Sequence, residues 1–181
     1  DDLVPSIIEA ISFDKVVGLF QGKMEFGPRA LCHRSIIYHC KDVKINDWLN
    51  KRLNRTEFMP FAPVTIEELA PKCYQGWEKK HIASKYMTIT YNCTPKMAKD
   101  CPATVHIDNT ARPQVINKND EKLMHRILTY WYQKTGGLSL INTSFNKHEE
   151  PIVCNPYDAI DSLIDCQVDV LAIGSYFVTK K

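Results

Sequence analysis

Apolar residues recur along this chain with two different periods, and this alternation constrains its fold more than any other feature. Short apolar runs typical of buried strands are interspersed with segments whose apolar residues share one face of a helix. The pattern predicts strands at 16–20, 35–39, 62–66, 87–91, 105–108, 114–116, 138–141 and 170–173, and helices at 5–13, 43–53, 121–134 and from 156 to about 166. Strands and helices that alternate in this way predict an α/β or α+β domain.

Capping residues mark the ends of two of these helices. Gly136 follows the helix at 121–134, where a left-handed C-terminal cap is expected. Asn155, Pro156 and Asp158 match the N-cap, first and third positions of the last helix. The helix at 43–53 is predicted to be amphipathic, with a polar face that carries Asn46, Asn50 and Lys51.

Length and composition describe one large globular domain. Its 181 residues are enough to bury a core, and 44% hydrophobic and 24% charged residues are ordinary proportions. A net charge of +2 argues against nucleic acid as a partner, and no apolar run reaches the roughly 18 residues that span a bilayer. The chain starts at Asp1 without methionine or leader, so we expect a domain, 1–181, cut from a longer cytoplasmic polypeptide.

The seven cysteines form no C-x-x-C pair and no regular framework. This usage favours reduced thiols in a cytoplasmic protein. Cys32-His33 and His39-Cys40 suggest zinc ligands, but adjacent residues rarely reach one tetrahedral ion together, so no metal site is predicted. The same geometric argument disfavours Cys32 as a nucleophile with His33 as its base.

Four polar segments are candidates for chemistry, because functional residues concentrate in loops. The first, 21–35, follows a predicted strand and contains Gly27-Pro28, Arg29 and Arg34. Pro28 is expected to begin a short helix whose free N–H groups attract anions, and both arginines suit bidentate phosphate contacts. Glu25 is expected to pair with one arginine and orient it. A surface turn with an Arg–Glu ion pair is the structural alternative.

The second segment, 51–63, gathers Lys51, Arg52 and Arg55 ahead of a rigid corner rich in phenylalanine and proline. Such a corner would fix the position of the basic residues. Cations at a helix end also favour the helix dipole, and that simpler role stays open.

The third segment, 106–114, is rich in hydrogen-bonding side chains and lies between two predicted strands. Strand alternation would place His106, Asp108, Thr110 and Arg112 on one side. A plain turn at Asp108-Asn109 is the structural alternative.

The fourth segment, 142–151, follows the predicted central strand. Ligands in α/β folds commonly bind beyond the carboxyl ends of strands. Asn142, Ser144 and Asn146 offer amide and hydroxyl groups for phosphate or sugar oxygens, although the same residues also form ordinary turns.

Familiar phosphate and hydrolase motifs are missing from the sequence. It contains neither G-x-x-x-x-G-K-[ST] nor G-x-G-x-x-G, and no G-x-S-x-G elbow. A nucleotide would have to be held by arginine, lysine and polar side chains.

The four segments, in this order, resemble the C-terminal domain of the O-carbamoyltransferases, which include nodulation-factor and antibiotic-tailoring enzymes. The matching elements are GKMEFGPRAL, FMPFAP, HIDNTARPQ and NTSFN-x-x-E-E-P-I-V, and the resemblance spans about residues 16–178. It implies an α/β fold of the YrdC/Sua5 type, a twisted mixed sheet with flanking helices around a basic cavity. It also implies that carbamoyl phosphate and ATP, with Mg²⁺ held mainly by phosphates, yield carbamoyl adenylate. A larger N-terminal domain, similar to the Kae1 type, would then move the carbamoyl group to an acceptor hydroxyl.

The resemblance also implies site residues. Those expected to take part in catalysis are Arg112, Lys51, Arg55 and His106. Those expected to bind substrate or nucleotide are Arg29, Arg34, Asn142, Ser144 and Asn146.

The chain departs from the family's pattern at several positions. Cys32-His33 stands where the family usually has glycine and a small polar residue, and Asn109 replaces a usual glycine. Thr56 and Met59 occupy positions that are commonly Glu and Arg. These departures motivate an alternative hypothesis, a nucleotide- or RNA-binding module with the YrdC-like fold that has lost the adenylating activity. A purely structural domain that closes over a catalytic partner is a third hypothesis.

Overall fold

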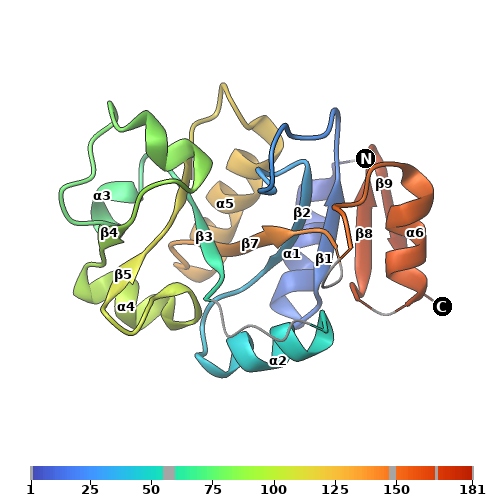
Figure 1. Ribbon diagram of the computed structural model, residues 1–181, viewed down its shortest axis with the longest axis horizontal. Helices are drawn as coiled ribbons and strands as arrows, with labels where there is room; N and C mark the ends of the chain where they lie inside the picture. The colour runs from blue at the N-terminus through green and yellow to red at the C-terminus, as the bar shows by residue number, and fades with distance from the viewer. Residues whose placement is uncertain (1, 55–59, 147–149, 166, 181) are drawn as a thin grey trace. The chain divides into compact units, whose positions relative to one another are not determined.

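The computed structural model describes residues 2–54, 60–146, 150–165 and 167–180, which fall into two units (Figure 1). The first unit comprises Asp1–Tyr38, Asp47–Phe58 and Asn142–Lys181. The second comprises His39–Asn46 and Met59–Ile141. Each unit therefore combines segments that are distant in the sequence.

A mixed sheet forms the centre of the first unit. Its strands are β1 (Val17–Phe20), β2 (Arg34–Tyr38), β8 (Val170–Ile173) and β9 (Tyr176–Thr179), in the order β2-β1-β8-β9. β1 runs antiparallel to β2 and parallel to β8, while β9 runs antiparallel to β8. Every residue of β1 and β2 is buried, so both faces of this part of the sheet are covered.

Helices pack on this sheet and complete the first unit. α1 (Leu3–Ser12) contacts β1, β8 and β9, and α6 (Pro156–Ile164) contacts β1 and β8. The side chain of Asn155 accepts the N–H groups of Tyr157 and Asp158, and the Asp158 carboxylate accepts the N–H of Asn155. This reciprocal cap confirms the predicted start of the last helix.

The second unit has two short strand pairs. β3 (Ala62–Ile66) and β6 (Gln114–Ile116) pair in parallel, and β4 (Tyr91–Asn92) and β5 (Thr110–Ala111) pair antiparallel. The long helix α5 (Lys122–Thr135) contacts β3 and buries Trp131. It ends at Gly136, whose φ of +73° confirms the predicted cap.

The remaining elements are short, except for a helix and a strand that contain residues of both units. The short elements are α3 (Ala70–Cys73), the 3₁₀ helices η1 (Ile82–Tyr86) and η2 (Pro102–Thr104), and α4 (Pro95–Asp100). The two that contain residues of both units are α2 (Lys44–Arg52) and β7 (Leu140–Ser144).

The mixed sheet with flanking helices confirms the predicted α/β class, and the strands at 62–66 and 170–173 have the predicted bounds. The strand predicted at 87–91 is wrong. Met87 follows η1 with a φ of +54°, and only Tyr91 joins a strand. Met87 and Tyr91 are both buried, so a strand-like alternation arises without a strand.

Two further differences concern α2 and β9. Asn50 is only 7% exposed, so its predicted place on a polar helix face is wrong. β9 was not expected, because the prediction ended the last strand at Ile173; the residues of β9 are only partly buried. Its pairing with β8 after Gly174, whose φ is +55°, makes it a strand.

Candidate functional site

The first motif forms the loop between β1 and β2, residues 21–33. No helix lies in this fully described stretch, so the helix expected at Pro28 is wrong. Gly22 and Gly27 have φ values of +50° and +113°, which only glycine adopts without strain. The chain therefore turns through glycine conformations, and the loop offers no helix N-terminus to an anion.

Glu25 holds the returning side of this loop through the backbone. Its Oε1 accepts the N–H groups of Leu31 at 2.6 Å, His33 at 2.8 Å and Arg34 at 3.1 Å. The expected ion pair with an arginine is thus replaced by amide contacts. Burial lowers the pKa of Arg34, and the nearby Glu25 charge counteracts that shift.

The Arg34 side chain holds the outgoing side of the loop. It is 4% exposed, and its Nη1 donates to the carbonyls of Gln21 at 2.8 Å and His33 at 3.1 Å. Its Nη2 donates to the carbonyl of Gly22 at 3.1 Å, and the guanidinium lies 3.6 Å from the centre of the Phe20 ring. These contacts make Arg34 a residue that shapes the loop. Its contact with a substrate stays a prediction.

Arg29 lies nearer the tip of the same loop. Its side chain is partly exposed, and Phe26 beside it is fully exposed. An arginine in this setting is accessible to an anion from solvent, which is what its predicted role requires.

Strand β7 brings the fourth motif against the first within the first unit. β7 continues to Ser144, three residues past the predicted strand end at Ile141, so Asn142 lies in the strand and not in a loop. Asn142 is 1% exposed, and its Nδ2 donates to the carbonyl of Ala30 at 3.3 Å. The N–H of Phe145 donates to the carbonyl of Arg34 at 3.1 Å. Two of the four motifs therefore meet.

Ser144 and Asn146 lie where the chain leaves β7. Both side chains are partly exposed, on either side of the buried Phe145. The Nδ2 of Asn146 donates to the carbonyl of Glu150 at 2.8 Å. Their contact with a nucleotide stays a prediction.

Cys32 occupies a backbone position that favours glycine. Its φ is +86°, its side chain is 4% exposed, and its N–H donates to the Oγ of Ser35 at 3.0 Å. A left-handed angle is easiest without a Cβ, which explains why the resembled family usually has glycine at this position.

The second motif contains an arginine that is bound within the protein, Arg52, and a lysine that is exposed, Lys51. Arg52 forms a bidentate ion pair with Asp169, at 2.8 Å and 3.0 Å. The Oδ2 of Asp169 also accepts the N–H of Val16 at 2.8 Å. Burial alone would raise the pKa of Asp169, but the hydrogen bonds from Arg52 and Val16 lower it.

Lys51 is exposed on α2, as its predicted substrate contact requires. Arg55 lies outside the described residues, as do Thr56 and Met59. The predicted basic cluster is thus described only at Lys51 and Arg52, and Arg52 is engaged with Asp169.

The third motif forms a turn, so the strand predicted at 105–108 is wrong. The N–H of Asn109 donates to the carbonyl of His106 at 2.9 Å, and Asn109 has a φ of +64°. The predicted grouping nevertheless occurs: Thr110 Oγ1 lies 2.9 Å from His106 Nδ1 and donates to Asp108 Oδ1 at 2.7 Å. These side chains are brought together by a turn, whereas the prediction had placed them on one side of a strand.

Arg112 belongs to the same polar group in the second unit. It is partly buried in the link between β5 and β6. Burial lowers the pKa of His106, the Arg112 charge lowers it further, and Asp108 counteracts both. The imidazole of His106 is therefore mainly neutral at pH 7, with an arginine and a carboxylate near it.

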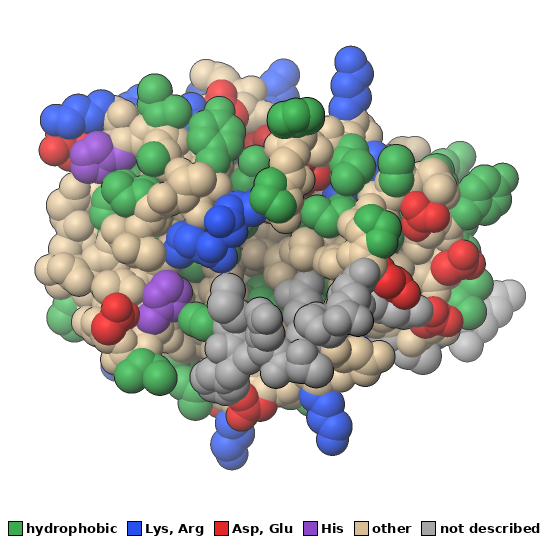
Figure 2. Space-filling view, in the orientation of Figure 1, with side chains coloured by type: hydrophobic (Ala, Val, Ile, Leu, Met, Phe, Trp, Pro, Cys, Tyr) green, Lys and Arg blue, Asp and Glu red, His purple; other side chains and the backbone are tan. Residues whose placement is uncertain are grey.

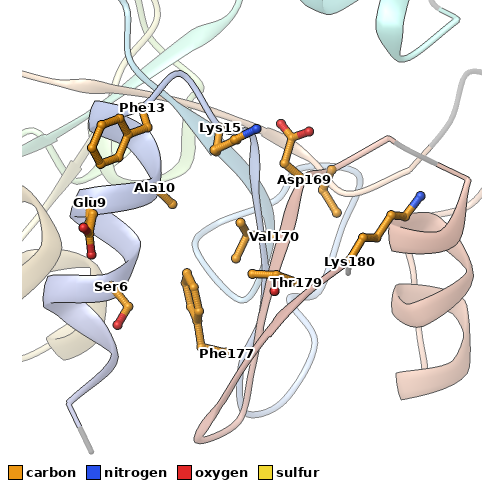
Figure 3. Close-up of a pocket in the computed structure, with 11 residues that line it drawn as sticks. Ser6, Glu9, Ala10, Phe13, Lys15, Asp169, Val170, Phe177, Thr179 and Lys180 are labelled. Carbon is orange, nitrogen blue, oxygen red and sulfur yellow. The ribbon is translucent and has the colours of Figure 1, made fainter.

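A cavity of about 720 Å³ lies between α1, β8 and β9 of the first unit, and Asp169, the partner of Arg52, is among its lining residues (Figure 3). Phe13, Val170 and Phe177 contribute apolar walls, and the lining carries charges of both signs, from Glu9, Asp169, Lys15 and Lys180. In the part of the chain that the structure describes, its lining includes none of the predicted site residues.

Acidic side chains gather over the face that carries α6 (Figure 2). Four of them, Glu150, Asp158, Asp161 and Asp165, line a second cavity of about 410 Å³. A face of this charge repels phosphate, so an anion site in the first unit is better sought at the loop between β1 and β2.

Residues 2–54, 60–146, 150–165 and 167–180 contain no group of three or more His, Cys, Asp or Glu side chains that could hold a metal ion. In the same residues, every helix is too short or too polar to cross a membrane.

Similar sequences agree with the motifs. Residues 8–180 match the family described as Carbamoyltransferase C-terminus. The chain is 38% identical over 174 residues to the uncharacterized protein MJ1058 of Methanocaldococcus jannaschii. It is 31% identical over 182 residues to the nodulation protein NolNO of Sinorhizobium fredii. These alignments cover 96% and 100% of this chain but 28% and 27% of the relatives, so the chain spans less than a third of their length.

Two solved structures of HypF share the fold. Full-length HypF in its phosphate- and nucleotide-bound form has a TM-score of 0.62, with 18% identity over 96% of this chain and 21% of HypF. HypF of T. kodakarensis has a TM-score of 0.63, with 16% identity over 94% and 20%. At such low identity the likeness concerns the fold alone.

Proposed function

Because the chain belongs to the family of carbamoyltransferase C-terminal domains, we propose that it binds carbamoyl phosphate and ATP and forms carbamoyl adenylate. The step consumes one water: carbamoyl phosphate is hydrolysed to carbamate and phosphate, and a carbamate oxygen then displaces pyrophosphate from the α-phosphate of ATP. An N-terminal domain similar to the Kae1 type, within one cytoplasmic polypeptide, then transfers the carbamoyl group to an acceptor hydroxyl. Mg²⁺ enters with ATP, because it prefers phosphate oxygens and water.

The observation that carries this proposal is the meeting of the first and fourth motifs. Asn142 bonds to Ala30, and Phe145 bonds to Arg34, so the backbone segments that carry Arg29 and Ser144 lie side by side. We infer that Arg29, Ser144 and Asn146 act on one ligand there. This set combines a guanidinium with neutral hydrogen-bonding groups. Such a set suits a phosphate and the polar atoms of a nucleotide. HypF has been captured with this class of ligand.

Activation of a carbamate brings anions together, and fixed cations must offset their repulsion. Each arginine–phosphate hydrogen bond contributes about 1.5–3 kcal/mol. By resemblance, we assign this charge to Arg29, Lys51, Arg112 and Arg55. The intermediate hydrolyses readily, so a pocket that excludes water is part of the proposal.

His106 and Arg112 are the proposed catalytic pair of the third motif. Because the Oγ1 of Thr110 donates to Asp108, the Nδ1 of a neutral His106 donates to Thr110, and its Nε2 is an acceptor for a proton or for the amino group of the carbamoyl moiety. Asp108 bonds the same threonine and thereby fixes the orientation of the imidazole ring.

Pyrophosphate release tests this function in the protein expressed with any sequence that its gene encodes upstream of Asp1. Release should require both ATP and carbamoyl phosphate. Arg112→Ala should lower turnover at least tenfold, because it removes a charge-assisted contact. Lys99→Ala, an exposed change at the end of α4, should have no such effect.

Three outcomes separate the hypotheses. Release that depends on both substrates supports the enzyme. Tight ATP binding without release favours the nucleotide-binding module, and RNA binding with a steep salt dependence favours its RNA form. If the protein neither binds these ligands nor releases pyrophosphate, both hypotheses are contradicted.

A further inference from the structure

The loop between β1 and β2 contains a converging set of backbone amides. The N–H groups of Leu31, His33 and Arg34 all point to one oxygen, Oε1 of Glu25. The intervening N–H of Cys32 points elsewhere, to the Oγ of Ser35. Successive N–H groups that converge in this way form an anion-binding concavity.

That concavity is filled by the protein itself. Oε1 of Glu25 lies at hydrogen-bond distance from all three donors, so an external phosphate has no access to them while the carboxylate stays in place. These three amides therefore do not cradle phosphate as those of a P-loop do, and the contact falls to other groups of the loop.

A second contact braces the opposite side of the loop. The guanidinium of Arg34 donates to the carbonyls of Gln21 and Gly22, at the start of the loop. Glu25 binds amides at its end, and the two side chains attract each other electrostatically. One buried cation and one carboxylate thus tie both limbs of a loop that contains no helix, together with the N–H of Gln21, which donates to the carbonyl of His33 at 2.9 Å.

We propose that Glu25 is a positioning residue that holds the loop in the shape from which Arg29 contacts an anionic substrate. Because Glu25 occupies the amide concavity permanently, the loop is already ordered before the substrate arrives. Less binding free energy is then spent on ordering it. The consequence for substrate binding rests on the proposed function, whereas the loop-holding contacts do not.

Hydrogen exchange tests the contacts directly. In Glu25→Ala the amides of Leu31, His33 and Arg34 should exchange faster, because they lose their acceptor. Glu25→Gln keeps an acceptor oxygen and should show a smaller increase. Glu78→Ala, an exposed residue paired with Lys80, is the matched control and should leave these three amides unchanged. Equal protection in wild type and Glu25→Ala would overturn the assignment.

Substrate kinetics test the positioning role. Glu25→Ala should raise KM for carbamoyl phosphate about tenfold while kcat falls less, and Glu25→Gln should raise it by a smaller factor. Added formate should restore part of the affinity of Glu25→Ala and leave wild type unaffected. A protein that is merely less stable would not recover in this way.

Each remaining outcome has a defined meaning. If calorimetry shows that Glu25→Ala binds inorganic phosphate more tightly than wild type, the carboxylate competes with the ligand and the positioning role is wrong. An unchanged KM in a folded Glu25→Ala would also overturn it. If no variant or wild type releases pyrophosphate, the proposed function fails, but the exchange experiment still decides whether Glu25 holds the loop.

Discussion

Replacement of Asp169 by asparagine should destabilise the first unit more than is usual for a single substitution near the surface. Asp169 receives two charge-assisted hydrogen bonds from Arg52, at 2.8 Å and 3.0 Å, and one from the N–H of Val16. Each such bond to a charged group contributes about 1.5–3 kcal/mol. The Asp169 and Arg52 side chains are 26% and 18% exposed, so solvent screens part of the attraction between their charges. Asp169→Asn removes the charge and turns an N–H₂ group toward a donor, and we expect a loss of about 2 kcal/mol.

Urea denaturation followed by circular dichroism measures this loss. The folded-state pKa of Asp169 is lowered, so its stabilising contribution is present above its ordinary value of 3.8 and is lost as the pH falls through the folded-state pKa. The difference between wild type and Asp169→Asn should therefore shrink below that pH. Asp100→Asn removes the exposed Lys96–Asp100 pair and should cost at most about 0.5 kcal/mol. The reasoning is refuted if both variants lose the same stability at pH 7, or if the difference persists in acid.

Two further predictions concern packing and titration. Gly18→Ala would place a Cβ 2.7 Å from the Phe145 ring, so it should cost about 1–3 kcal/mol in urea denaturation. Phe145→Leu should relieve part of this, and a strictly additive double-mutant cycle would contradict the clash. In an NMR titration, Arg112→Ala should raise the pKa of His106 and Asp108→Asn should lower it, whereas shifts of the same sign would disprove the assigned neighbours. Because the folded-state pKa of His106 is lowered, its contribution to stability should decline as the pH falls below 6.5.

The structure changes the role of the two arginines of the first motif. Arg34 looked equivalent to Arg29 as a phosphate ligand, but it is buried and donates to the carbonyls of Gln21, Gly22 and His33. Arg29 is the partly exposed member of the pair. Substitution of Arg34 should therefore disturb the loop as a whole, and substitution of Arg29 is the cleaner test of substrate contact.

Local signals predicted those parts of the fold that depend on neighbouring residues. The cap at Asn155 and Asp158 and the left-handed Gly136 are formed within a few residues, so sequence alone suffices to find them. Buried strands with dense apolar runs, such as β3 and β8, were found for a similar reason. The hairpin partner of the last predicted strand, β9, was missed, although only Gly174 and Ser175 separate it from β8.

The errors share a cause: apolar periodicity does not indicate which groups a residue will hydrogen-bond. Met87 and Tyr91 alternate like a strand, but the chain at Met87 closes a 3₁₀ helix. The helix expected at Pro28 does not form, because left-handed glycines and the Glu25 carboxylate turn that loop. In both places the deciding contacts are local: the N–H of Met87 donates to the carbonyl of Ala83, and Glu25 accepts the N–H of Leu31 six residues away. Apolar periodicity does not report such backbone turns and side-chain bonds.

The sequence by itself determined the α/β class, the helix caps and, through four ordered motifs, the family. These are properties of residue types and their order, which the chain carries before it folds. Only the tertiary structure decided which motif side chains touch: that Asn142 reaches Ala30, that Arg52 is engaged with Asp169, and that Glu25 fills its own amide concavity. Those contacts join residues whose distance in space depends on the path of the folded backbone. Apolar periodicity does not predict that path.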